Sequence, residues 1–195
     1  GGLTIDANTG EIDLSSATAG NYQVTYTTTS SGNWQQIGQD IDGEAAGDQS
    51  GGLSKLAINS IGNVVAIGAE WNDGNTGDIF NNGGHVRIYE WDGTSWTQRG
   101  QDIDAEAAND KNSNVSISNN GNIVAVGANF HGSNGIRSGY VRIFQYNGTN
   151  WTQLGQDIDG EAAEDQSGYS ISLSGDGTRL AIGAGGNDGN GDGSG

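Results

Sequence analysis

Apolar and polar residues alternate with a period of two along several short segments of the chain, which predicts β-strands. Residues 56–59 alternate in this way, and residues 86–89 repeat the pattern. Between them, 64–69 reads Val-Val-Ala-Ile-Gly-Ala, an almost continuous apolar run typical of a strand buried on both faces. Asp92-Gly93 predicts a turn into a further strand at 95–98. Because no stretch has helical spacing over three turns, the pattern predicts an all-β protein.

The same pattern of predicted strands recurs along the chain. The consensus W-x-Q-x-G-Q-D-I-D-x-E-A-A-x-D begins at Trp34, Trp96 and Trp151, and a second shared block ending in Gly-Ala follows each time. A unit of about 60 residues with four short strands is typical of a β-propeller blade. Two copies are complete and the third is partial, so we expect a partial propeller of about two and a half blades. The recurring tryptophan is expected to pack between blades, with a stacking platform for carbohydrate as the alternative.

The first 31 residues lack this repeat and are predicted to form a separate domain. They contain predicted strands, one of which places Tyr22, Val24 and Tyr26 on one face, before a short Ser-Ser-Gly linker. We interpret 1–31 as a β-sandwich remnant, the last strands of an earlier domain. Residues 32–195 are the repeats, with bounds at about 34–95, 96–150 and 151–195, the last incomplete. The chain is therefore expected to be part of a longer protein.

Composition and charge narrow the function classes. The chain has 195 residues, a net charge of −17, 36 Gly and no Cys. Without Cys there is no disulfide, thiolate metal site or cysteine nucleophile. The 7 Lys and Arg are scattered, so a nucleic-acid partner is not expected. No apolar run approaches 18 residues, so membrane insertion is not expected either.

The repeats resemble bacterial FG-GAP-type repeats, which are related to the propeller head of integrin α-subunits. Residues 48–51 and 165–170 stand where the family has its Phe-Gly start, and 66–69, 125–128 and 181–184 stand where it has Gly-Ala-Pro. The chain departs from the family in having Ser for Phe and no Pro. Residues 1–31 resemble the end of Ig-like or cadherin-like repeats of bacterial surface proteins. These resemblances imply a secreted, multidomain cell-surface or matrix protein with a binding or adhesive role.

One acidic segment of the repeat is a candidate cation site. Family propellers often hold Ca²⁺ in the turn between the first two strands, but the turn at 59–63 lacks carboxylates, so that site is not carried over. The repeated spacing of Asp40, Asp42, Glu44 and Asp48 instead offers carboxylates that suit a hard cation such as Ca²⁺. The alternative is a solvated loop whose Asp residues cap turns.

A second candidate is the loop after each Gly-Ala block. Carboxylate and amide oxygens alternate there with glycine, at Asp73, Asn75 and Asp78 and again at Asp188, Asn190 and Asp192. The middle copy reads Asn-Phe-His-Gly-Ser-Asn at 129–134 and has no carboxylate, so a site would not occur in every blade. By resemblance this loop lies on the face that family propellers use for ligands. The alternative is a long polar loop.

Nothing in the sequence indicates catalysis. His85 opens a predicted strand and Tyr140 takes its place in the next copy, which favours a packing or surface role; His131 is expected to be exposed. No G-x-S-x-G motif with downstream partners occurs. We therefore expect a non-catalytic binding or adhesion module, with no catalytic residues, whose partners are a protein or glycan on a surface or matrix and the remaining blades of the same chain. The alternatives are a passive spacer and an accessory module of a secreted hydrolase.

Overall fold

The computed structural model describes residues 4–5, 12–13, 36–52, 55–73, 82–191 and 194–195. The chain divides into two compact units, Gly1–Gln36 and Ile37–Gly195. In the first unit, β1 (Thr4–Ile5) pairs antiparallel with β2 (Ile12–Asp13). The strand predicted at 20–27 and the linker predicted at 30–32 lie outside the described residues.

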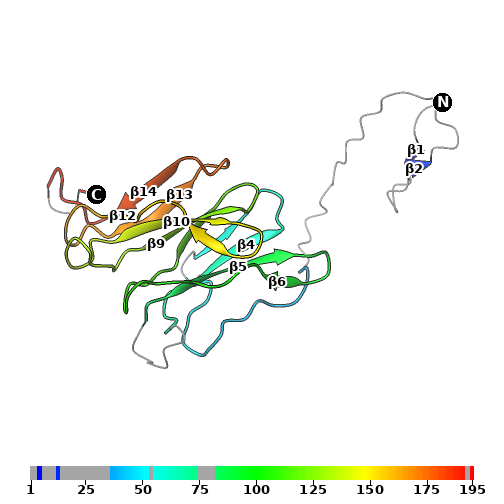
Figure 1. Ribbon diagram of the computed structural model, residues 1–195, viewed down its shortest axis with the longest axis horizontal. Helices are drawn as coiled ribbons and strands as arrows, with labels where there is room; N and C mark the ends of the chain where they lie inside the picture. Colours follow the sequence, from blue (N-terminus) through cyan, green and yellow to red (C-terminus); the bar gives the residue numbers. More distant parts are fainter. Residues whose placement is uncertain (1–3, 6–11, 14–35, 53–54, 74–81, 192–193) are drawn as a thin grey trace. The chain divides into compact units, whose positions relative to one another are not determined.

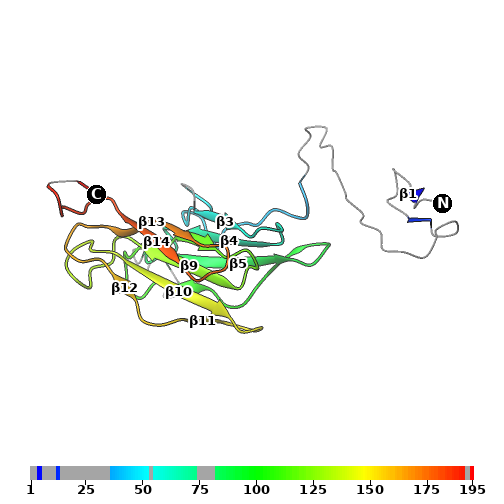
Figure 2. The ribbon, with the colours of Figure 1, turned by 90° about the horizontal axis from the view of Figure 1, so that it is seen from above.

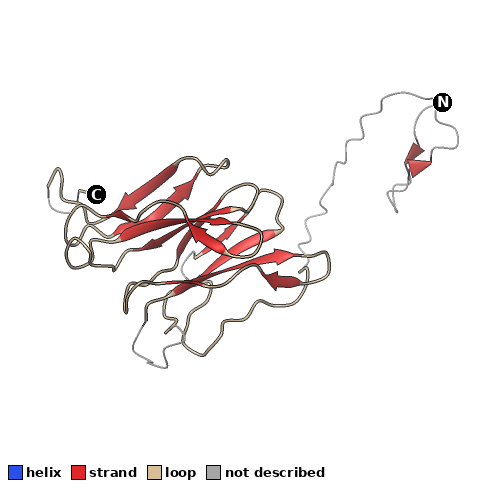
Figure 3. Ribbon diagram, viewed as in Figure 1, coloured by secondary structure: helices blue, strands red, loops and turns tan. Residues whose placement is uncertain are grey.

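The second unit contains three antiparallel sheets, and no helix occurs in the part of the chain that the structure describes (Figures 1 and 3). In the first sheet the order is β3 (Leu56–Ile58), β4 (Val64–Ala69), β5 (His85–Trp91) and β6 (Trp96–Gln98), and β7 (Ile103–Asp104) also pairs with β5. In the second it is β8 (Asn114–Ile117), β9 (Ile123–Ala128), β10 (Tyr140–Tyr146) and β11 (Trp151–Gln153), and β12 (Ile158–Asp159) also pairs with β10. The third sheet pairs β13 (Ser167–Leu173) with β14 (Leu180–Ala184).

The all-β prediction is confirmed, and so are the strands predicted at 56–59, 64–69, 86–89 and 95–98. The described residues form open sheets and no closed ring of blades, so the propeller stays a prediction. Each outer strand begins at the tryptophan that we placed at the start of the next copy, which means that neighbouring copies share a sheet.

The acidic segment contains strands that the sequence pattern did not reveal. Ile103 pairs with Val86 and Asp104 with His85, and β12 pairs with β10 in the same way. Only two residues pair in each case, too few for alternation to be recognised. This pairing matters for the site, because it brings the acidic segment alongside the third strand of the sheet.

The sheets stack face to face in chain order (Figure 1), and Figure 2 shows them from above, overlapping one another. Strand β8 contacts β3 and β4 of the first sheet, and β13 contacts β8 and β9 of the second. The apolar core lies between the first two sheets and consists of Val64, Ala66, Val86, Ile88, Ile103, Ile117, Val124, Val126, Phe144 and Trp151. The glycine of each Gly-Ala block allows this approach, since a Cβ on Gly68 would lie 2.0 Å from the Ser113 carbonyl oxygen.

Trp151 packs between the first and second sheets, in line with the predicted role of the recurring tryptophan. The Trp151 indole donates a hydrogen bond to the Arg99 carbonyl (2.7 Å), and the Gln101 side chain bonds both the N–H and the C=O of Trp151 (3.0 and 2.8 Å). Trp96 makes the same contacts with Ile37 and Gln39, which precede the first sheet, and it is only partly buried. Trp151 is 3% exposed, which favours packing over a carbohydrate platform. Trp34 lies outside the described residues.

Candidate functional site

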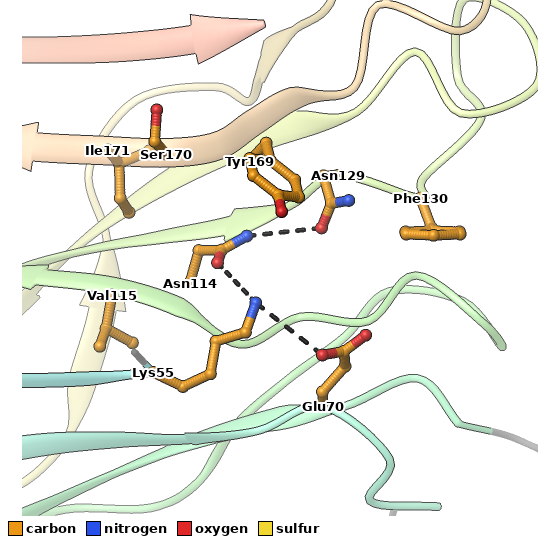
Figure 4. A pocket seen from close by; sticks show the side chains of 9 residues that line it. All are labelled: Lys55, Glu70, Asn114, Val115, Asn129, Phe130, Tyr169, Ser170 and Ile171. Atoms are coloured by element: carbon orange, nitrogen blue, oxygen red, sulfur yellow. Dashed lines mark hydrogen bonds and ion pairs between the residues drawn. The ribbon is translucent and has the colours of Figure 1, made fainter. Parts of the chain in front are cut away.

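A cavity of about 490 Å³ lies where the three sheets meet (Figure 4). Each copy contributes to its wall: Lys55 and Glu70 from the first, Asn114, Val115, Asn129 and Phe130 from the second, and Tyr169, Ser170 and Ile171 from the third. The volume is within the range of small-ligand sites.

The same framework position carries a different side chain in each wall of this cavity. The Lys55 carbonyl accepts a hydrogen bond from the Gly68 N–H. In the other two sheets Asn114 is the strand partner of Gly127, and Ser170 is the strand partner of Gly183. These glycines belong to the three Gly-Ala blocks, so Lys55, Asn114 and Ser170 are equivalent in the fold. The backbone of the cavity therefore follows the repeat, and its chemistry does not.

Hydrogen bonds link the polar side chains of the cavity. The Lys55 ammonium donates to Asn114 Oδ1 (2.6 Å) and lies 3.9 Å from Glu70 Oε2. Asn114 Nδ2 donates in turn to the Gly168 carbonyl (2.9 Å) and to Asn129 Oδ1 (3.4 Å). Burial lowers the pKa of Lys55, and the Glu70 carboxylate opposes that shift. The polar wall is thus held in place before any ligand enters.

Aromatic side chains border the polar wall. Tyr169 is 61% exposed and lines the cavity, as does Phe130. The Lys111 ammonium lies 4.5 Å from the Phe130 ring centre and 3.1 Å from Glu70 Oε1. Amide and ammonium groups beside an exposed ring suit a ligand that has hydroxyl groups and an apolar face.

Sequence reasoning did not single out the cavity residues. Lys55 precedes β3, Asn114 begins β8 and Ser170 lies within β13, and the sequence pattern assigned no binding role to these positions. Their shared position becomes visible when the copies are aligned on Gly-Ala, and their convergence depends on how the sheets stack.

The predicted carboxylates of the segment 40–48 have three different surroundings in the structure. Glu44 lies beside His85 and Arg87 of β5 and beside Asp102, which is between β6 and β7. Arg87 binds Glu44 Oε1 through its Nη2 and Asp102 Oδ1 through its Nε (3.2 Å). His85 Nδ1 is 3.6 Å from Glu44 Oε2 and 3.8 Å from Asp102 Oδ2. Asp40 and Asp42 are exposed and are not part of this cluster.

Asp48 has a different position, inside its own loop. Its buried carboxylate accepts hydrogen bonds from the Ala45 N–H (3.0 Å) and from Asn72 Nδ2 (3.0 Å). Asp110 and Asp165 accept the equivalent bonds from Ala107 and Ala162. These contacts match the turn-capping alternative for this position.

The loops after the Gly-Ala blocks are described in part. Asp73 Oδ1 accepts a hydrogen bond from the Asn82 N–H (3.1 Å). The exposed Asp188 and Asn190 lie in a turn closed by a bond from the Gly191 N–H to the Asp188 carbonyl (3.0 Å). Three of the predicted ligands lie outside the described residues: Asn75, Asp78 and Asp192. Calcium binding by these loops stays a prediction.

The Glu44–His85–Asp102 cluster has a counterpart in the second copy. There Glu106 contacts Arg142 (3.4 Å), Asp157 replaces Asp102, and Tyr140 stands in place of His85. Burial raises the pKa of Glu106, and a hydrogen bond with Asp157 raises it further. Glu161, Asp165 and Asn187 of the third copy line a cavity of about 230 Å³.

His131 is less exposed than its loop position predicted, because the loop folds back onto the acidic segment. Its Nδ1 lies 3.0 Å from Asp110 Oδ1, and its ring packs edge-on against Tyr140 with centres 4.5 Å apart. The side chain is 15% exposed. His131 occupies the position of Asn72, which binds the equivalent Asp48.

The chain was compared with known protein families and with curated proteins. No family matches it. No curated protein matches it either. In the described residues, no helix has the length and apolar character needed to cross a membrane.

Proposed function

We propose that the chain is a non-catalytic binding module of an extracellular bacterial surface protein, and that it recognises a glycan in the cavity between its three sheets. In this proposal the sheets are consecutive blades of an FG-GAP-type propeller. The face-to-face stacking of β8 on β3 and β4, repeated by β13 on β8 and β9, supports that part.

One observation carries the functional proposal: equivalent positions around the cavity hold different side chains. A passive spacer needs only the framework, which the Gly-Ala blocks, the capping Asp residues and the tryptophans repeat faithfully. Lys55, Asn114 and Ser170 differ where the framework is constant. Such divergence is expected of a recognition surface built on a repeated scaffold.

The chemistry of the cavity favours a glycan. Asn129 lines the cavity with an amide group, and Tyr169 offers an exposed ring face. The net charge of −17 disfavours anionic partners, so the proposed ligand is a neutral or cationic sugar chain.

The test is binding of the chain to a printed array of oligosaccharides, followed by calorimetry with the best ligand. We expect Tyr169→Ala to weaken binding about tenfold or more through loss of ring contact. Ile136→Ala is the matched control, because Ile136 is 74% exposed and lies outside the cavity. Binding that is unchanged in Tyr169→Ala, or no binding at all, would contradict the proposal and favour the passive spacer.

A further inference from the structure

The His85 side chain is buried yet lacks a hydrogen bond to any described residue. It is 3% exposed, and its Nδ1 faces two carboxylate oxygens at 3.6 and 3.8 Å. Both distances exceed the usual hydrogen-bond length of about 3 Å. A buried imidazole normally has a partner, so this arrangement requires an explanation.

The three facing atoms have the spacing of ligands that share one metal ion. Glu44 Oε2, His85 Nδ1 and Asp102 Oδ2 all lie within 4.8 Å of one another. Two ligands of a tetrahedral ion, each about 2.1 Å from it, are roughly 3.4 Å apart. The two distances from His85 Nδ1 are close to that value, so a small shift of the side chains would bring all three atoms into coordination.

Arg87 orients both carboxylates without occupying the facing oxygens. It binds Oε1 of Glu44 and Oδ1 of Asp102, which leaves Oε2 and Oδ2 directed at His85. Gln98 also holds Asp102 Oδ1 (2.5 Å), and Asn72 contacts Glu44 Oε2 (3.3 Å). Groups that fix the orientation of metal ligands in this way are a regular part of metal sites.

The local charge attracts a cation despite Arg87. The charged groups that act on His85 are Asp102, Arg87, Glu44 and Asp104. When the imidazole is neutral, the three carboxylates and the one guanidinium give this cluster a net negative charge. Arg142 reaches the carbonyl of Asp104 from the next sheet (2.6 Å), but its nearest carboxylate is Glu106.

We propose that Glu44, His85 and Asp102 bind one divalent transition-metal ion of the zinc class. One nitrogen and two carboxylate oxygens suit Zn²⁺, whereas Ca²⁺ takes six to eight oxygen ligands. A fourth position remains for water. The site joins the loop of the first copy to that of the second, so bound metal ties the two copies together at this point.

The experiment measures Zn²⁺ binding to the metal-free chain by calorimetry and the visible absorption spectrum of the Co²⁺ form. Two variants use residues already present at equivalent positions. His85→Tyr copies Tyr140, and His131→Asn copies Asn72 and removes the other histidine of the chain. Glu44→Gln tests a carboxylate ligand whose side chain is 34% exposed, so the fold should tolerate it.

We expect one Zn²⁺ per chain in the wild type and in His131→Asn, with no displacement by millimolar Ca²⁺. His85→Tyr and Glu44→Gln should weaken binding by about 100-fold or more, because changes to residues that merely orient a ligand already cost about 10- to 100-fold. Equal Zn²⁺ binding by wild type and His85→Tyr would overturn the proposal, as would loss of binding in His131→Asn or displacement by Ca²⁺.

Discussion

At the scale of single residues, the copies preserve the backbone contact and vary the side chain that makes it. In the turn after β5, Asp92 Oδ1 accepts the N–H groups of Thr94 and Ser95 (2.7 and 2.8 Å). In the equivalent turn after β10, Asn147 Oδ1 accepts the N–H groups of Thr149 and Asn150 (3.0 and 2.9 Å). The geometry is shared, but only Asp92 can ionise.

This difference predicts a pH dependence. Hydrogen bonds from Thr94 and Ser95 lower the pKa of Asp92 to about 2. Its ionised form is favoured in the folded state, so its contribution to stability is complete above the unfolded pKa of about 4 and is lost as pH falls towards 2. Asp92→Asn, which copies Asn147, cannot ionise and therefore lacks this pH-dependent contribution to stability.

Urea unfolding of wild type and Asp92→Asn between pH 6 and pH 2 measures the pH-dependent contribution of Asp92 to stability. Above about pH 5 we expect a constant difference in unfolding free energy between the two proteins. Between about pH 4 and pH 2 we expect the wild type to lose more unfolding free energy than Asp92→Asn. A difference that stays constant throughout would show that the turn does not favour the carboxylate.

At the scale of elements, the second strand of each sheet determines how closely the next sheet approaches. Strand β9 is buried along nearly its whole length, and a Cβ on Gly127 would lie 2.4 Å from the Gly168 carbonyl oxygen of β13. Gly68 has the same relation to Ser113. The glycine in an otherwise apolar strand is thus explained by the contact between sheets.

Gly127→Ala is therefore expected to destabilise the protein by about 3 kcal/mol, since the methyl group meets backbone that cannot rotate away. Gly185→Ala is the control, because nothing lies within 4 Å of a Cβ there. Thermal or urea unfolding of both variants gives the comparison. Equal stability of the two variants would mean that the second and third sheets are not in close contact.

At the scale of the whole second unit, burial is uneven along the stack. Five of the six residues of the central strand β9 are buried, whereas none of the five residues of β14 is. The middle sheet is covered by the first sheet on one side and by β13 on the other. Local opening should therefore require less free energy in the third sheet than in the second.

Hydrogen exchange followed by mass spectrometry or NMR measures this gradient. We expect amides of β9 to exchange roughly 100-fold or more slowly than those of β14 at neutral pH. The two strands are compared in one sample, so solution conditions cancel. Uniform protection across the three sheets would show that the stack unfolds as a single cooperative unit.

The sequence by itself determined the class of structure, the longer strands and their repetition, but not the two-residue strands β7 and β12. These follow from local causes: alternation specifies one buried face, as at 86–89, and Asp-Gly or Asn-Gly specifies the turn. The packing of Trp151 between sheets was also predictable, because burial of a large apolar ring is favourable. Trp96, whose partners precede the first sheet, is only partly buried.

Only the tertiary structure decided which residues meet. Asp40, Asp42, Glu44 and Asp48 are close in sequence, yet the fold directs Asp48 into its own loop and turns Glu44 towards His85. Lys55, Asn114 and Ser170 are more than 50 residues apart and line one cavity. The physical reason is that strand pairing and sheet stacking are long-range contacts, so the direction of each side chain depends on neighbours that no local pattern records.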